Sequence, residues 1–131
     1  MRFFLLALIA LLSSAHALAD DCDNAWRNGD MIHCAAARYQ EADKKLNQTW
    51  QKVQKRARPE QRPLLKQAQN AWIALRDADC RLIASGAEGI RLQPMIVNDC
   101  LEAKTVEREA FLSSLLRCEE GDLSCPLPRP D

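Results

Sequence analysis

Six cysteines in a short chain are the feature that most constrains what this sequence can fold into. They are Cys22, Cys34, Cys80, Cys100, Cys118 and Cys125 of 131 residues. An even number of cysteines in a small exported protein is typical of a disulfide framework. A metal site is the competing interpretation, but the sequence has no CxxC pair, and His33 is the one histidine beyond residue 16. We therefore expect disulfides, and no metal or other cofactor.

The N-terminal residues predict export. Arg2 precedes an apolar run over residues 3–12, which is shorter than the roughly 20 residues of a membrane span. Ala17-Leu18-Ala19 fits a signal peptidase, so we expect cleavage near Ala19 and a protein that is periplasmic or secreted. A lipoprotein is disfavoured because Cys22 follows two aspartates instead of a small residue. A retained N-terminal anchor is the alternative to cleavage.

Length and charge limit the remaining possibilities. We expect a signal peptide at 1–19, one helical domain at 20–117 and a disulfide-closed, proline-rich tail at 118–131. The chain carries 18 basic and 18 acidic residues, which argues against a nucleic-acid partner. The sequence has no second hydrophobic segment, so we expect a mature protein that does not span a membrane.

Three segments show helical periodicity, at residues 29–57, from about residue 60 to 84, and from about 93 to 117. Their apolar stripes are Ala35, Tyr39, Ala42, Leu46, Trp50 and Val53; then Leu65, Ala68, Trp72, Leu75 and Leu82; then Ile96, Cys100, Ala103, Val106, Ala110 and Leu112. Pro59 and Pro94 suit the starts of the second and third helices, and Pro63 must then lie in the first turn or bend it. Short connections force antiparallel neighbours. The expected fold is all-α: a small three-helix up-down-up bundle stapled by disulfides.

The spacing of the cysteines leaves two pairings open. One set is local: Cys22–Cys34, Cys80–Cys100 and Cys118–Cys125. The rival set joins Cys34 to Cys80 and Cys22 to Cys100, because Cys34 and Cys80 lie at comparable distances from the Pro59 turn. We favour the local set, because Cys80 and Cys100 also flank the expected turn after residue 84 at similar levels.

A longer pattern of residues resembles a known family. It comprises Met31-x-x-Cys34, Tyr39, Ala42-Asp43-x-x-Leu46-Asn47, Trp50, Pro59-Glu60-Gln61, Ala68-Gln69-x-Ala71-Trp72-x-x-x-Arg76-Asp77-x-x-Cys80, Cys100, Thr105 and Arg108. This pattern is similar to the N-terminal domain of LprI-like lysozyme inhibitors, over about residues 22–116. The resemblance implies a helical, cysteine-bridged, exported domain whose namesake inhibits host-type lysozyme. This chain departs from the namesake in lacking a lipobox and a further domain, and its 118–125 loop lies outside the family pattern.

The polar members of the pattern are expected to have a structural role. They are Asp43, Asn47, Gln69, Arg76 and Asp77, which surround Trp72 in the expected hairpin. Asp43 and Arg76 lie at similar distances from Pro59, so an antiparallel hairpin predicts a carboxylate–guanidinium pair. A catalytic or ligand-binding cluster is the alternative interpretation.

Charged residues gather at two places. The expected hairpin tip is basic, with Lys52, Lys55, Arg56, Arg58, Arg62 and Lys66, and we call these six residues the basic tip. The opposite end is expected to collect Asp20, Asp21, Asp23, Glu88, Glu119, Glu120 and Asp122. Both ends have a simpler interpretation as solvated helix ends.

The expected function is binding, without catalysis. The sequence has no Ser-His-Asp set, no GxSxG motif and no phosphate-binding loop, so we expect no enzyme. The first hypothesis is a lysozyme inhibitor that inserts an acidic, glycine-containing loop, with Ser85, Gly86, Glu88 and Gly89, into the cleft of a basic lysozyme. The alternative is an envelope structural or stress protein whose basic tip binds anionic cell-wall or lipid components.

Overall fold

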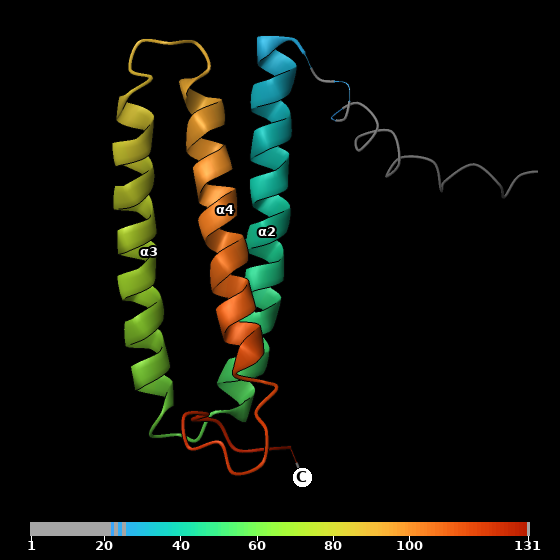
Figure 1. Ribbon diagram of the computed structural model, residues 1–131, viewed down its shortest axis with the longest axis vertical. Helices are drawn as coiled ribbons and strands as arrows, with labels where there is room; N and C mark the ends of the chain where they lie inside the picture. Colours follow the sequence, from blue (N-terminus) through green and yellow to red (C-terminus); the bar gives the residue numbers. More distant parts are fainter. Residues whose placement is uncertain (1–21, 23, 25, 131) are drawn as a thin grey trace, which may run out of the picture.

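The computed structural model describes residues 22, 24 and 26–130 and contains three helices (Figure 1). They are α2 (Asn28–Arg56), α3 (Arg62–Ser85) and α4 (Gln93–Ser114). The described residues form no strand. The chain runs up, down and up, which confirms the expected all-α bundle with disulfides. The expected signal peptide and Asp20, Asp21 and Asp23 lie outside the described residues.

Local sequence explains where the helices begin and end. Asp30 in the first turn of α2 and Lys55 and Arg56 in its last turn complement the helix dipole. Pro63 lies in the first turn of α3, where its missing N–H costs no hydrogen bond. Pro94 has the same place in α4. Pro59 lies outside α3, in the turn between α2 and α3, so the expectation that it opens the second helix is wrong.

Helix α4 lies between the other two helices (Figure 1). It packs most extensively along α2 and less along α3, while α2 and α3 have only marginal contact. Arg38 of α2 anchors one end of the α2–α4 pair, where its Nη2 lies 3.1 Å from Asp99 Oδ1 and its Nε 3.4 Å from Glu102 Oε2. Further along, the Thr49 hydroxyl donates to Glu109 Oε1 over 2.9 Å. These bonds fix the register of the two helices.

The expected apolar stripe is confirmed for α2 and wrong for much of α3 and α4. Ala35, Leu46 and Val53 are buried. On α3, by contrast, Ala68, Leu75 and Leu82 are exposed, and the same holds for Ala103, Val106 and Ala110 on α4. The physical reason is the arrangement of the helices. Helix α4 packs on both other helices, whereas α3 packs mainly on α4, so these helices bury different faces from those that hydropathy selects.

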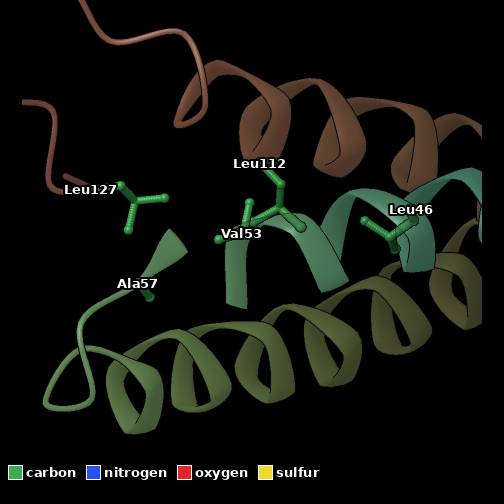
Figure 2. Packing of buried hydrophobic residues seen from close by; sticks show 5 residues of the cluster. All are labelled: Leu46, Val53, Ala57, Leu112 and Leu127. Atoms are coloured by element: carbon green, nitrogen blue, oxygen red, sulfur yellow. The ribbon is translucent and has the colours of Figure 1, made fainter. Parts of the chain in front are cut away.

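The core lies at the end of the bundle where α2 joins α3, and the C-terminal tail closes it. Leu46, Val53, Ala57, Leu112 and Leu127 form one buried cluster. Figure 2 shows Leu127 on the tail, facing the end of α2. Trp50, Leu65, Trp72, Leu115 and Leu116 pack around the cluster. The tail is therefore part of the fold, although its prolines exclude regular secondary structure.

Three disulfides join Cys22 to Cys34, Cys80 to Cys100, and Cys118 to Cys125. Their Cα atoms are 5.5, 5.6 and 5.7 Å apart, within the usual range for such bridges. The local arrangement is confirmed, and the rival pairing of Cys34 with Cys80 is wrong. The bridge between Cys80 and Cys100 ties α3 to α4 near the α3–α4 loop, where both cysteines are buried.

Candidate functional site

An arginine–aromatic cluster joins the three helices around Trp72. The guanidinium carbon of Arg76 lies 4.9 Å from the centre of the Trp72 ring, and that of Arg108 lies 5.6 Å from it. Arg76 also lies over Tyr39 of α2 at 5.7 Å, and Arg108 lies over Phe111 at 4.9 Å. Trp72 thus has a guanidinium from its own helix and one from α4 within cation–π distance.

Hydrogen bonds hold both guanidinium groups in place. Arg108 Nε donates to Oε1 of the buried Gln69 over 2.9 Å. Arg76 Nε lies 3.0 Å from Asp77 Oδ1, and the Arg76 side chain is only 10% exposed. Burial lowers the pKa of the Arg108 guanidinium, which stays protonated at neutral pH. Gln69, Trp72, Arg76 and Asp77 therefore form one cluster on α3, which Arg108 joins to α4.

The expected pair between Asp43 and Arg76 does not form. Asp43 instead accepts a 3.3 Å hydrogen bond from Asn47 Nδ2, one turn along the same helix. Arg76 pairs with Asp77 and reaches α2 at Tyr39, one turn closer to the start of α2 than Asp43. The predicted pair requires α2 and α3 to pack directly against each other at the level of these residues. In the structure, α4 is the main neighbour of both helices.

The surroundings of Tyr39 oppose the ionisation of its phenol group. Partial burial raises the pKa of its phenol, the positive charge of Arg76 lowers it, and Asp43 and Asp77 raise it further. Burial is the largest of these causes, so the net direction is upward. The arrangement keeps a neutral phenol beside a cation, which suits packing better than acid–base chemistry.

The α3–α4 loop forms one end of the molecule and is held by several bonds (Figure 1). Backbone N–H groups of Ala87 and Ile90 each donate over 3.0 Å to the carbonyl groups three residues earlier. Gln93 Nε2 donates to the Ala84 carbonyl over 3.2 Å. Gly89 has φ +79°, a conformation that favours glycine. Ser85, Gly86, Glu88 and Gly89 are all exposed on this loop, as is Ile90, a residue that sequence reasoning missed.

The expected separation of charge between the two ends is wrong for the tail. Gln61 Nε2 donates to the Pro126 carbonyl over 2.8 Å, and Arg56 Nη1 donates to the Leu116 carbonyl over the same distance. The tail, with Glu119, Glu120 and Asp122, therefore lies at the end of the basic tip and away from the α3–α4 loop (Figure 1). The physical reason is topology, because a third antiparallel helix ends where the first one ends.

The basic tip is also partly occupied by contacts within the molecule. Arg56 binds the Leu116 carbonyl, Arg58 lies 2.9 Å from Glu60 Oε1, and Arg62 Nε donates to the Gln54 carbonyl over 3.2 Å. Lys52, Lys55 and Lys66 are exposed. The positive charge of the tip is thus diluted by Glu60 and by the acidic tail.

Metal sites and membrane spans are absent from the part of the chain that the structure describes. It holds no cluster of three or more histidine, cysteine, aspartate or glutamate side chains placed to bind a metal ion. None of its helices has the length and apolar character needed to cross a bilayer.

Comparison with known proteins gives two matches. The model of a family described as Lysozyme inhibitor LprI matches residues 20–112. A protein of Rhizobium meliloti (strain 1021), named Uncharacterized protein R02472, is 33% identical over 114 residues, covering 77% of this chain and 82% of the relative. No solved structure matches the chain.

Proposed function

Because this chain belongs to the LprI family of lysozyme inhibitors, we propose that it is an exported protein that binds a lysozyme-type muramidase and blocks its substrate cleft. Family membership is the observation that carries this proposal. The disulfides support export, since such bridges persist in oxidising compartments. The protein acts by steric blockade, without a cofactor and without catalysis of its own.

The α3–α4 loop is the proposed contact. Its tip presents one carboxylate, Glu88, beside the exposed side chain of Ile90. An exposed apolar side chain gains free energy when it enters a cleft, and a carboxylate attracts a basic enzyme. Glu88 is the single carboxylate of residues 86–92, and the exposed Arg91 balances its charge, so the proposed electrostatic attraction is confined to the immediate surroundings of Glu88.

Rigidity makes this loop suitable for blocking a cleft. The Cys80–Cys100 bridge, the Gln93 side chain and successive turn hydrogen bonds hold it before any partner arrives. A loop that is already ordered loses little conformational entropy on binding. A flexible loop with identical side chains would bind more weakly, because binding would have to order it first.

A lysozyme lysis assay tests the proposal. The disulfide-bonded protein is expected to slow the lysis of bacterial cells at micromolar concentration, more strongly at low salt than at high salt. Glu88→Lys and Ile90→Asp are each expected to weaken inhibition by about ten-fold, which corresponds to roughly 1.4 kcal/mol.

Glu119→Lys is the matched control, since it makes the same charge change at an exposed position at the other end of the molecule. It is expected to keep most of the inhibition. Undiminished lysis in the presence of the unmodified protein at low salt would contradict the proposed function. Inhibition that is equally sensitive to Glu119→Lys would contradict the proposed contact.

A further inference from the structure

The outward side of α3 carries a continuous row of exposed apolar side chains. The row consists of Leu64, Ala68, Ala71, Leu75, Ala78 and Leu82, and we call it the α3 row. All six are exposed, and the three leucines retain 65%, 61% and 73% of their accessible surface. Monomeric proteins seldom leave large side chains exposed in one contiguous line.

The α3 row is distinct from the face that α3 uses inside the bundle. Its inward face is formed by Gln69, Trp72, Arg76, Cys80 and Ala84, which include the three buried residues of the helix. The row and these residues lie on different sides of the helix, since they occupy different positions in the 3.6-residue period. Helix α4 therefore covers the inward face and leaves the row in solvent.

The spacing of the α3 row indicates that its partner is a helix. Successive members are separated by 4, 3, 4, 3 and 4 residues, which is the spacing of a coiled-coil seam. The row runs for about 27 Å, because 18 residues of helix rise roughly 1.5 Å each. Alanine at three of its six positions allows another helix to approach closely.

The α3 row is complementary to itself. Its six positions are symmetric about Ile73, so that an antiparallel second copy places every member opposite a member. Leu64 then faces Leu82 at both ends, and Leu75 faces Ala71 near the middle. A two-fold interface requires this kind of self-complementarity.

The charges of α3 favour the antiparallel direction. Residues 62–72 of the helix contain two basic residues and no acid, whereas residues 73–85 contain two acids and two arginines and so have no net charge. Antiparallel pairing sets the basic half of one copy beside the half of the other that has no net charge, and it also opposes the two helix dipoles. Parallel pairing would set like charges side by side.

We propose that the α3 row is a homodimer interface in which α3 of two copies pair antiparallel. The two α3–α4 loops then lie at opposite ends of the dimer, where neither is covered by the other copy. This proposal is independent of lysozyme binding, since its test measures only the mass and the arrangement of the protein.

Sedimentation of the disulfide-bonded protein tests the interface. At about 100 µM the unmodified protein is expected to sediment with twice the mass of one chain. Leu75→Glu and Leu82→Glu are each expected to raise the dimer dissociation constant by at least ten-fold, because a carboxylate on the seam is desolvated by pairing. Both leucines are exposed in the single chain, so the thermal midpoint of a monomeric variant serves as its folding control.

Asn70→Glu is the matched control, since it places the same side chain at an exposed position of α3 outside the row. It is expected to remain dimeric. A single-chain mass for the unmodified protein at this concentration would overturn the proposal. So would a dimer that persists in both leucine variants.

A photo-cross-link tests the direction of pairing. With a benzophenone amino acid in place of Leu82, the antiparallel arrangement predicts a cross-link to the other copy near Leu64. Mixing isotopically labelled and unlabelled protein identifies links between copies. A link to the region around residue 82 of the other copy would overturn the antiparallel arrangement.

Discussion

Trp72 packs between the guanidinium groups of Arg76 and Arg108, which are held by different kinds of partner. Arg76 has Asp77 beside it, but Arg108 is held by the neutral amide of Gln69 and by two aromatic rings. Cation–π contacts contribute about 0.5–2 kcal/mol, and more when water is excluded. The ring of Trp72 also packs against the buried core. One side chain thus serves both the polar cluster and the apolar one.

Replacing Trp72 is expected to destabilise the fold strongly. Trp72→Ala removes the ring that both guanidinium groups share and opens a gap beside the core, with an expected loss of about 3 kcal/mol. Urea unfolding of the purified variant measures this change. Trp26→Ala is the control, because Trp26 is 78% exposed, and it is expected to change stability by less than roughly 0.5 kcal/mol. Similar losses in the two variants would contradict the role assigned to Trp72.

Tyr39 gives a direct measure of burial in the cluster. It is the single tyrosine of the chain, so tyrosinate absorbance reports on it alone. Because burial raises the pKa of Tyr39, its phenol is expected to titrate above the ordinary value of 10.0 in the folded protein. In the urea-unfolded protein it is expected to titrate close to that value. A raised folded pKa means that stability is fully present below the unfolded pKa and falls as the pH rises through the folded pKa. Coincident titration curves would show that Tyr39 is not buried.

At the scale of the helices, the sequence predicted where α2, α3 and α4 lie but not which faces of α3 and α4 are buried. Proline positions and apolar spacing place helix ends locally, and here the ends agree within a few residues. The buried face depends on how many neighbours a helix has. Leu75 and Leu82 fit a core stripe in the sequence and are nevertheless exposed, because α4 is the one substantial neighbour of α3 and covers a different face.

The candidate site was predictable to the same extent. The sequence pattern identified Gln69, Trp72, Arg76 and Asp77, which the structure brings together. It did not predict that Arg108 of α4 is the second cation on Trp72, because that contact depends on the tertiary arrangement. The available signal was that Arg108 is itself a member of the sequence pattern.

Helix α3 is held to the bundle by limited packing and by one covalent link, Cys80–Cys100. Its removal in the double variant Cys80→Ser/Cys100→Ser is expected to cost about 3 kcal/mol, as for a closed loop of this length. Hydrogen exchange is expected to accelerate first in the second half of α3 and in the α3–α4 loop. Equal acceleration in α2 would contradict this local role. The double variant Cys22→Ser/Cys34→Ser is the control, because its bridge does not touch α3.

For the whole molecule, the sequence misplaced the tail. Its charges were assigned to the end of the α3–α4 loop, although three antiparallel helices bring the C-terminus to the α2–α3 turn. Tail docking itself had no local signal, since Leu127 stands among prolines in a segment without regular structure. The burial of Leu127 depends on its packing against Ala57 and Val53 at this end of the helices.

The buried tail is expected to contribute measurably to stability. Leu127 is 6% exposed within the core cluster, so Leu127→Ala is expected to cost about 2–3 kcal/mol. Leu123→Ala makes the same chemical change at a fully exposed position of the tail and is expected to be nearly neutral. Thermal melts of the two variants compare them directly. Equal midpoints would show that the tail does not close the core.

Leu127 follows α4 in the chain, so this member of the core is synthesised after all three helices. One end of the core stays open until the segment after α4 has been synthesised. The helical hairpin of α2 and α3 cannot mature ahead of translation, since its main neighbour α4 and its closing leucine are both made later. A nascent chain that has not yet reached Leu127 therefore lacks one member of its core cluster even when all three helices are present.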